Sequence, residues 1–331
     1  MKGSMKKRSI LRKYCVVLAL VIMANVFLVE ALFAKGAVVG YVWGGHSVSD
    51  DQLENLTHIM AVDLYIKTNG ELFPNPDLGS NWSNSWLTPL VNRAHQKGVQ
   101  VSIVIAEGIN YMNFGVVTAN STIRGTFVSH IANFVNQYNL DGVNIDWEYP
   151  SAAQWPNCIS LLTDLKTALP NKRISIALSG DGPNDYPNQN YPHQIWQTVD
   201  AIHLMTYDLP YPRFPTHSDF QASKASIDAW ASWGTPKGLD KEKLFMGCAF
   251  YGYKKDSNGN TLWGNANKVS YSVYFAGGNY NSGDDTNSMA TKVNYCYNQG
   301  YGGVFFWHLG YDVPINNANP QSLLKATYRE L

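Results

Sequence analysis

The sequence predicts an α/β protein built as a single (β/α)8 TIM barrel. Eight short apolar runs recur along the chain, and most of them are separated by segments with helical spacing. Several runs are apolar at nearly every position, as is typical of parallel strands that are buried on both faces. The chain has 331 residues, which is enough for one barrel of about 250 residues. We find no internal repeat or linker, so we expect one domain at 35–331.

The first 34 residues resemble a secretory signal peptide in composition. Basic residues at positions 2–13 precede an apolar run from Tyr14 to Leu28, and the small residues Ala31 and Ala34 follow. The run is short for a membrane span, which needs about 20 residues. We therefore expect a signal peptide at 1–34, a secreted, periplasmic or extracellular protein, and no stable membrane insertion after cleavage. An uncleaved anchor is the alternative.

Eight strands and the helices between them follow in order. Segment 122–138 shows the apolar spacing of an amphipathic helix, and Gly98 is placed to end the helix before it. The predicted strands are 37–43, 56–64, 99–106, the stretch ending at 150, 173–179, 199–207, 243–251 and 303–307. The predicted helices are 86–96, 122–138, 157–169, 223–233 and 289–299. The polar link 253–288 is expected to be a long loop with a short hairpin.

Composition favours a neutral carbohydrate as the partner. The formal net charge is +0 with 15% charged residues, which argues against nucleic acid. The chain has 10 Trp and 20 Tyr, whose flat faces can stack on sugar rings, although most should fill the core. Without Cys15 of the leader, Cys158, Cys248 and Cys296 remain, an odd number without a metal-site pattern. We expect no metal, no disulfide framework, and a monomer.

The stretch 140–150 carries the most informative pattern. Asn144, Asp146 and Glu148 alternate with apolar residues, which predicts a strand with two different faces. Same-side neighbours are roughly 6.5 to 7 Å apart, so an ionised carboxyl at one position raises the pKa of the next. A carboxyl that stays protonated is what acid-catalysed bond cleavage requires. Pro150 ends the strand and places Glu148 at the catalytic end of a barrel. A solvated edge strand is the alternative.

This stretch resembles a family signature. The sequence Asp-Gly-Val-Asn-Ile-Asp-Trp-Glu at 141–148 is similar to the D-G-x-D-x-D-x-E motif of glycoside hydrolase family 18, the chitinase family, with Asn144 where Asp is usual. The segment 205–208, Met-Thr-Tyr-Asp, is similar to the family's M-x-Y-D motif. The segment 302–312 resembles the closing strand, whose Trp, here Trp307, forms the floor under the cleaved sugar.

The resemblance implies a substrate-assisted, retaining mechanism. Glu148 would protonate the glycosidic oxygen while the N-acetyl carbonyl of the substrate attacks the anomeric carbon. Asp146 would hold the acetamido N–H, Tyr207 would bind the acetamido oxygen, and Asp208 would help to orient it. No metal or organic cofactor is implied. The Asn144 amide cannot take up a proton, so we expect it to shift the rate and pH optimum without abolishing activity.

The remaining site residues are assigned by their position in these motifs or, for Tyr41, Trp43 and Tyr251, by their place at the ends of the first and seventh predicted strands. Supporting roles are implied for Asn144, Asp141, Met205 and Asp208, and substrate contacts for Trp307, Tyr41, Trp43, Tyr251 and Trp147. Tyr253 stands where the family commonly has Arg. The third strand, with Val104, Ala106 and Glu107, departs from the usual Ser-x-Gly-Gly. Glu107 is either a second binding carboxylate or a solvated loop residue. The link 253–288 is too short for the family's full insertion subdomain, which implies a more open groove.

The resemblance implies a secreted chitinase, a glycoside hydrolase that cleaves β-1,4 bonds next to N-acetylglucosamine in a polysaccharide or glycan. One alternative is an endo-β-N-acetylglucosaminidase that acts on glycoprotein glycans, or a peptidoglycan hydrolase. A non-catalytic chitinase-like glycan-binding protein is a further alternative. Such lectins usually lose the acidic Glu, whereas Glu148 is present here.

Overall fold

A computed structural model describes residues 36–76, 82–108, 110–181, 183, 191–209, 216–315 and 321–329. The segment expected to be a signal peptide, 1–34, lies outside these residues. From Ala37 onwards the described residues form one compact unit. Within it, no helix combines the length and the apolar character needed to cross a membrane.

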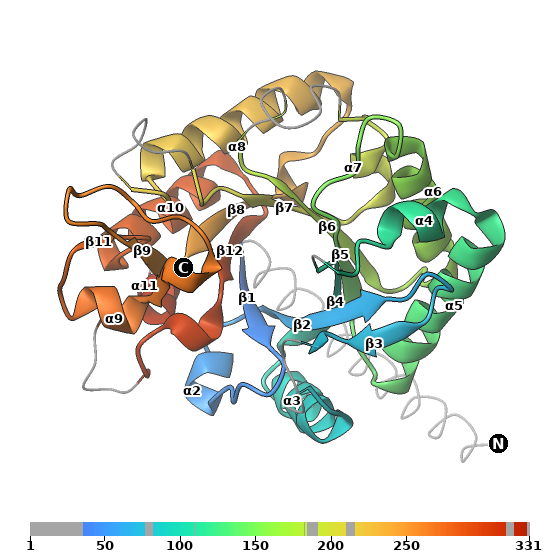
Figure 1. Ribbon diagram of the computed structural model, residues 1–331, viewed down its shortest axis with the longest axis horizontal. Helices are drawn as coiled ribbons and strands as arrows, with labels where there is room; N and C mark the ends of the chain where they lie inside the picture. Colours follow the sequence, from blue (N-terminus) through green and yellow to red (C-terminus); the bar gives the residue numbers. More distant parts are fainter. Residues whose placement is uncertain are drawn as a thin grey trace, which may run out of the picture. The chain divides into compact units, whose positions relative to one another are not determined.

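Eight parallel strands among the described residues close into a barrel, and helices surround them (Figure 1). The barrel closes because β1 pairs with β12 on one side and with β2 on the other. The strands are β1 (Ala37–Trp43), β2 (His58–Ile66), β4 (Gln100–Ala106), β5 (Gly142–Asp146), β6 (Arg173–Ser179), β7 (Ala201–Met205), β8 (Leu244–Ala249) and β12 (Gly303–Trp307). The predicted α/β class and (β/α)8 architecture are confirmed.

The outer layer contains the predicted helices and several short ones. At the end of the first long helix, Gly98 adopts a φ of 74°, and its amide donates to the carbonyl of His95, as expected of a glycine that ends a helix. The longer helices are α3 (Asn84–Gln96), α5 (Ser121–Gln137), α6 (Trp155–Ala168), α8 (Phe220–Gly234) and α10 (Thr286–Gln299). Short elements that we did not predict are α2 (Asp50–Leu53), β3 (Leu72–Pro74), α4 (Phe114–Ala119), α7 (Ile195–Thr198) and α11 (Leu323–Arg329).

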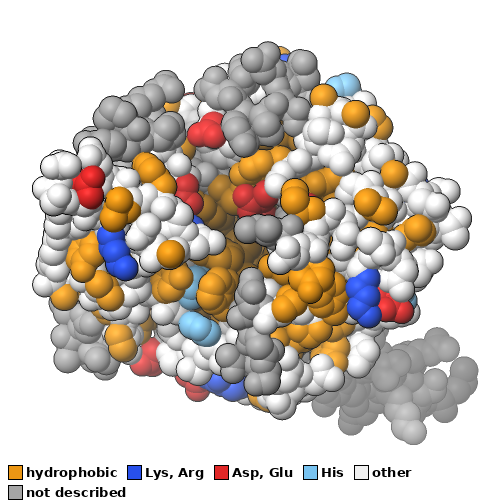
Figure 2. All heavy atoms as spheres, viewed as in Figure 1, with side chains coloured by type: hydrophobic (Ala, Val, Ile, Leu, Met, Phe, Trp, Pro, Cys, Tyr) orange, Lys and Arg blue, Asp and Glu red, His pale blue; other side chains and the backbone are white. Residues whose placement is uncertain are grey.

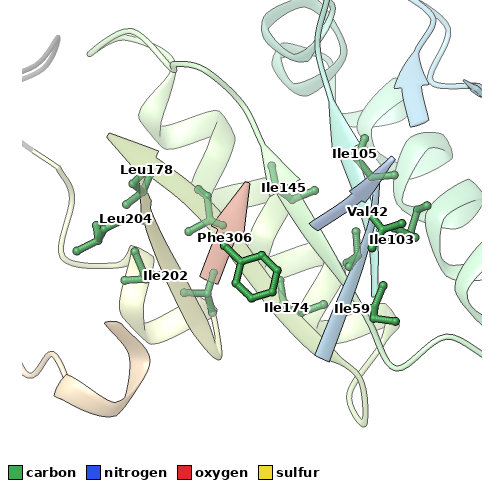
Figure 3. Close-up of a cluster of buried hydrophobic side chains, with 14 of the residues drawn as sticks. Val42, Ile59, Ile103, Ile105, Ile145, Ile174, Leu178, Ile202, Leu204 and Phe306 are labelled. Carbon is green, nitrogen blue, oxygen red and sulfur yellow. The ribbon is translucent and has the colours of Figure 1, made fainter. Parts of the chain in front are cut away.

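Side chains alternate between two faces along each barrel strand. Those that point outward, such as Ile59 and Ile145, pack against the helices and form the main core (Figure 3). Those that point inward form a second cluster that includes Phe305. Polar residues also lie inside the barrel, among them the fully buried Asn144 and His203. The interior is therefore a packed core at one end and becomes polar toward the other.

A small antiparallel sheet follows β8 at the rim of the barrel. It consists of β9 (Tyr251–Lys254), β10 (Lys268–Ser270) and β11 (Tyr280–Asn281), in the order β10-β9-β11, with α9 (Tyr271–Phe275) after β10. We expected only a long loop with a hairpin here. The additional helix forms because Tyr271 and Tyr274 are buried against the main core. The insertion is therefore ordered and small, and it contributes to the wall of the barrel opening.

The three cysteines within the described residues, Cys158, Cys248 and Cys296, are buried and free. Burial raises the pKa of the Cys158 thiol to about 12, because the thiolate would lose its hydration. Cys158 therefore behaves as a small apolar residue of the core.

A buried ion pair joins α10 to the loop after the insertion. Lys292 is fully buried, and its ammonium donates to Asp284 (2.9 Å) and to the hydroxyl of Ser218 (2.9 Å). Asp284 also accepts hydrogen bonds from the amide of Ala249 (2.9 Å) and the hydroxyl of Ser288 (2.8 Å). These contacts connect the end of β8 to α10, directly behind the rim of the barrel.

Replacing Lys292 by Met should destabilise the fold strongly, because it leaves Asp284 buried without its cation. We expect the free energy of unfolding in urea to fall by about 3 to 5 kcal/mol. Lys97→Met is the matched control, since Lys97 pairs with Glu54 at the surface and exposed pairs contribute little. Equal stability of the two variants would contradict this account of the buried pair.

Candidate active site

A cavity of about 620 Å³ opens at the carboxyl end of the barrel strands. Figure 2 shows a hollow in this face, with hydrophobic side chains inside it and acidic groups near its margin. The lining brings together nine of the twelve residues predicted for the site: Tyr41, Trp43, Asp146, Glu148, Met205, Tyr207, Asp208, Tyr251 and Trp307. They come from five different barrel strands or the loops that follow them, as the (β/α)8 architecture leads one to expect.

Three predicted site residues do not line the cavity. Trp147 is buried on the opposite side of its strand, where its ring stacks on Phe114 at 5.1 Å. The predicted contact of Trp147 with substrate is therefore wrong, and the side chain packs in the core instead. Asp141 lies at the amino end of β5, where its carboxylate accepts the amide of Val101 and contacts His95. This position makes Asp141 a residue of the barrel floor, far along the strand from the cavity.

Asn144 lies below the cavity in the barrel interior. It is fully buried, and its amide nitrogen donates to the hydroxyl of Ser175 on β6 (2.8 Å). Its carbonyl oxygen is buried and has no hydrogen-bond partner among the described residues. One oxygen of Asp146, two residues along on the same face, is likewise buried and accepts no hydrogen bond from the described residues. Two buried oxygens beneath the cavity can therefore still accept a hydrogen bond.

The strand β5 and the loop that follows it carry the two central carboxyl groups. It ends at Asp146, and Glu148 follows on the rim, one residue beyond Trp147. We predicted Glu148 at the end of the strand itself, so the strand is slightly shorter than expected. Asp146 lies beside Ala106 of β4 in the parallel register. Ala106, Asp146 and Glu148 all border the cavity, whereas Trp147 does not.

Both carboxyl groups hold their protons more firmly than ordinary acids. Burial raises the pKa of Asp146 well above its usual value, and the charges of Glu148 and Asp63 raise it further. Burial also raises the pKa of Glu148, while a hydrogen bond from Tyr149 and the charge of Lys268 oppose the shift. Because the two groups interact, their protons belong to the pair. The pair can therefore present an acid at a pH where an exposed carboxyl would be ionised.

Asp208 forms the opposite wall of the cavity, and its pKa is lowered where those of Asp146 and Glu148 are raised. Its backbone is left-handed, with a φ of 58°, and one carboxylate oxygen accepts the hydroxyls of Tyr251 (2.6 Å) and Tyr253 (2.8 Å). The ammonium of Lys268 lies 3.4 Å from the other oxygen. Burial alone would raise the pKa of Asp208, but the contacts with His217, Lys268 and Tyr251 outweigh it and hold the pKa well below its usual range. Asp208 is thus an ionised anchor for this wall.

Aromatic rings form the floor of the cavity. Trp307 ends β12, and its ring lies 5.8 Å from that of Tyr41 and 6.1 Å from that of Trp43. The hydroxyl of Tyr41 is 2.7 Å from the ring nitrogen Nδ1 of the buried His203, which holds the tyrosine in place from below. Tyr207 packs edge-on against Tyr251 on the other side. Such flat faces suit the apolar faces of pyranose rings.

The lining also contains residues that sequence analysis missed. Asp63 lies in β2 and accepts a hydrogen bond from Asn75 (2.9 Å). A carboxyl in a strand that is apolar or aromatic at all its other positions after His58 was a signal that could have revealed it. Lys268 belongs to the insertion, and no local pattern predicts its approach to Asp208. Glu107, for which we left two roles open, borders the cavity.

The cavity combines a pair of carboxyl groups that retain a proton with a floor of aromatic rings. Asp146 and Glu148 can supply and take back a proton, and the aromatic floor can hold a sugar ring over them. Across the described part of the chain, no group of three or more His, Cys, Asp or Glu is arranged to hold a metal ion. The chemistry that these side chains support is general acid–base catalysis on a bound ring.

Comparison with known proteins finds proteins named as chitinases that are similar in sequence or fold. A probable endochitinase of Caenorhabditis elegans is 25% identical over 315 residues, which cover 74% of this chain and 50% of that protein. Chitinase B of Serratia marcescens is 22% identical over 374 residues, covering 80% of this chain and 75% of that protein. A class V chitinase of Nicotiana tobaccum, solved in complex with NAG4, shares the fold with a TM-score of 0.73 and 21% identity, covering 89% of this chain and 99% of that one.

The chain spans about half the length of the first of these relatives. A match to the family Glycosyl hydrolases family 18 extends over residues 37–312 and includes every strand of the barrel. The matched region also contains the cavity and both carboxyl groups of β5 and its loop. This chain therefore belongs to glycosyl hydrolases family 18.

Proposed function

We propose that the protein hydrolyses β-1,4 bonds next to N-acetylglucosamine with retention of configuration and acts as a chitinase. The observation that carries the proposal is the pair Asp146 and Glu148, whose pKa values are both raised within one aromatic-floored cavity. A raised pKa suits a group that must donate a proton near neutral pH. The relatives named as chitinases, and the one solved with NAG4, support the choice of substrate.

In the first step, the sugar to be cleaved lies over Trp307. Glu148 donates its proton to the glycosidic oxygen, and the bond from that oxygen to the anomeric carbon breaks. The carbonyl oxygen of the substrate's own acetamido group attacks the anomeric carbon and forms an oxazolinium ion. Asp146 accepts a hydrogen bond from the acetamido N–H, which orients the acetamido group for attack and stabilises the intermediate as positive charge develops on it.

In the second step, Glu148 is ionised and acts as a base. It removes a proton from a water molecule, which attacks the anomeric carbon on the face that the leaving group vacated. The oxazolinium ring opens, the acetamido group is restored, and Glu148 regains its proton. Tyr207 donates a hydrogen bond to the acetamido oxygen, and Asp208 keeps the neighbouring wall in place. Two displacements at the same carbon retain its configuration.

Export is part of the proposal. The basic residues at positions 2–13, the apolar run from Tyr14 to Leu28 and the small residues Ala31 and Ala34 support a signal peptide at 1–34. The catalytic barrel would then occupy 35–331 and act outside the cell as a monomer on a polysaccharide or glycan that contains N-acetylglucosamine. Mass spectrometry of the mature N-terminus tests this assignment.

Removing the acid should abolish turnover. We expect Glu148→Gln to lower the release of a fluorophore from a fluorogenic N,N′-diacetylchitobioside by about 100-fold or more, because Gln cannot donate the proton. Glu71→Gln is the matched control, since Glu71 pairs with Lys67 at the exposed surface. We expect it to keep full activity.

The same experiment separates the competing functions. Turnover by both Glu148→Gln and the wild type would refute the assigned acid. If neither the wild type nor the control turns over chitin oligomers, an assay on high-mannose glycans and peptidoglycan tests the other hydrolase substrates. Binding of chitin oligomers without any turnover would favour a non-catalytic glycan-binding protein.

The pH profile should respond to Lys268. The positive charge of Lys268 lowers the pKa of Glu148, so Lys268→Met should raise it. Because Glu148 must be protonated, kcat/KM falls as pH rises through this pKa. We therefore expect the alkaline limb of the profile to move up by roughly 0.5 to 1 pH unit in Lys268→Met.

The control for this shift is Lys254→Met, which removes an exposed lysine from the neighbouring strand β9. It should leave the alkaline limb where it is in the wild type. A limb that stays in place in Lys268→Met, or that moves to lower pH, would show that Lys268 does not act on the proton donor.

A further inference from the structure

Glu107 is a cavity residue that the proposed mechanism does not use. It follows β4 directly, and β4 lies beside β5 with Ala106 next to Asp146. Neighbouring strands are about 4.8 Å apart, so Glu107 lies just beyond the end of the strand adjacent to β5, whose end carries the reacting carboxyls. A group at this place can contact a sugar unit that neighbours the one being cleaved.

One carboxyl oxygen of Glu107 accepts a hydrogen bond from the protein, and the other can bind a ligand. The backbone amide of Phe114 donates to Oε1 at 2.6 Å, which orients the carboxyl. No hydrogen bond to Oε2 is found among the described residues. Partial burial raises the pKa of Glu107 to about 7, although the amide of Phe114 opposes the shift. An ammonium group bound to Oε2 would offset the cost of this lost hydration.

The lining of the cavity has more carboxyl groups than cations. Its described lining includes one cation, Lys268, whose ammonium lies close to Asp208. Against this cation stand the carboxyl groups of Asp63, Glu107, Asp146, Glu148, Asp181 and Asp208. A fully acetylated chain is neutral and gains nothing from those carboxyl groups that are ionised, such as Asp208, whereas a cationic unit would be attracted by them.

Aromatic rings lie next to Glu107. Gly108 packs so closely on Tyr65 that a Cβ atom there would be 2.7 Å from its ring. The ring of Tyr65 lines the cavity and lies 5.9 Å from that of the partly exposed Tyr111, which is 5.0 Å from Phe73. Hydrophobic side chains gather beside the hollow on the side of β2 and β3 (Figure 2). A carboxylate next to aromatic faces suits a cationic sugar, which offers both a ring and an ammonium group.

We propose that Glu107 binds the free ammonium group of a glucosamine unit beside the N-acetylglucosamine that is cleaved, so that partially deacetylated chitin is a preferred substrate of this site. The inference rests on the proposed hydrolysis. It adds a charge contact that an N-acetylglucosamine unit at the same position cannot make, because its amide nitrogen is neutral. Glu107 thus acts in substrate selection, while Glu148 and Asp146 perform the chemistry.

The test compares two hexamers: one fully acetylated, and one in which some units carry free amines. We expect Glu107→Gln to lower kcat/KM on the partially deacetylated hexamer by about tenfold, since hydrogen bonds to charged groups are the stronger ones, and to change it less than about twofold on the fully acetylated one. Gln keeps a carbonyl oxygen for the amide of Phe114. Glu71→Gln is the matched surface control, and mass spectrometry of the products should place glucosamine next to the cleaved unit in the wild type.

The outcomes separate the two proposals. Equal losses on both hexamers, or no loss on either, would overturn the role of Glu107 while hydrolysis itself stands. A wild type that does not cleave the fully acetylated hexamer would instead refute the proposed function. If Glu107→Gln does not fold, inhibition of the wild type by fully deacetylated oligomers decides: inhibition that added salt weakens supports the ammonium contact, and absence of inhibition overturns it.

Discussion

The crowding of two carboxyl groups where β5 meets the rim is the constraint on which the site depends. Asp146 and Glu148 are both poorly hydrated, and the charge of Glu148 makes ionisation of Asp146 less favourable still. Such a pair is costly for stability, and it persists because the surrounding barrel is rigid and well packed. The same cost keeps a proton available, which is what cleavage of a glycosidic bond requires.

The barrel gives this pair its surroundings by bringing strand ends together. Asp208, far away in sequence, is kept ionised by His217, by Lys268 from the small insertion and by two tyrosine hydroxyls. The cavity therefore has one wall that retains protons and one that stays charged. Trp307 lies in the floor between them. Opposite pKa shifts within one cavity allow a proton donor and a fixed negative charge to coexist.

Much of this arrangement follows from local sequence patterns. The period-two alternation of β5 predicts that Asp146 and Glu148 share a face, and parallel strands predict that the ends of β5, β7 and β12 meet. The same alternation places Trp147 on the opposite face, so its predicted substrate contact conflicted with the strand pattern itself. Lys268 could not be predicted, because its contact with Asp208 joins residues 60 positions apart through a sheet that turn-rich sequence does not reveal.

The central claim is that the acetamido group of the substrate, aided by Asp146, forms the intermediate and leads to retention. The direct measurement is proton NMR of the first product released from a fully acetylated chitin oligomer, before its anomers equilibrate. The account predicts that the newly formed reducing end appears as the β-anomer. Initial appearance of the α-anomer would show a single displacement by water and would contradict the mechanism assigned to Asp146 and Glu148.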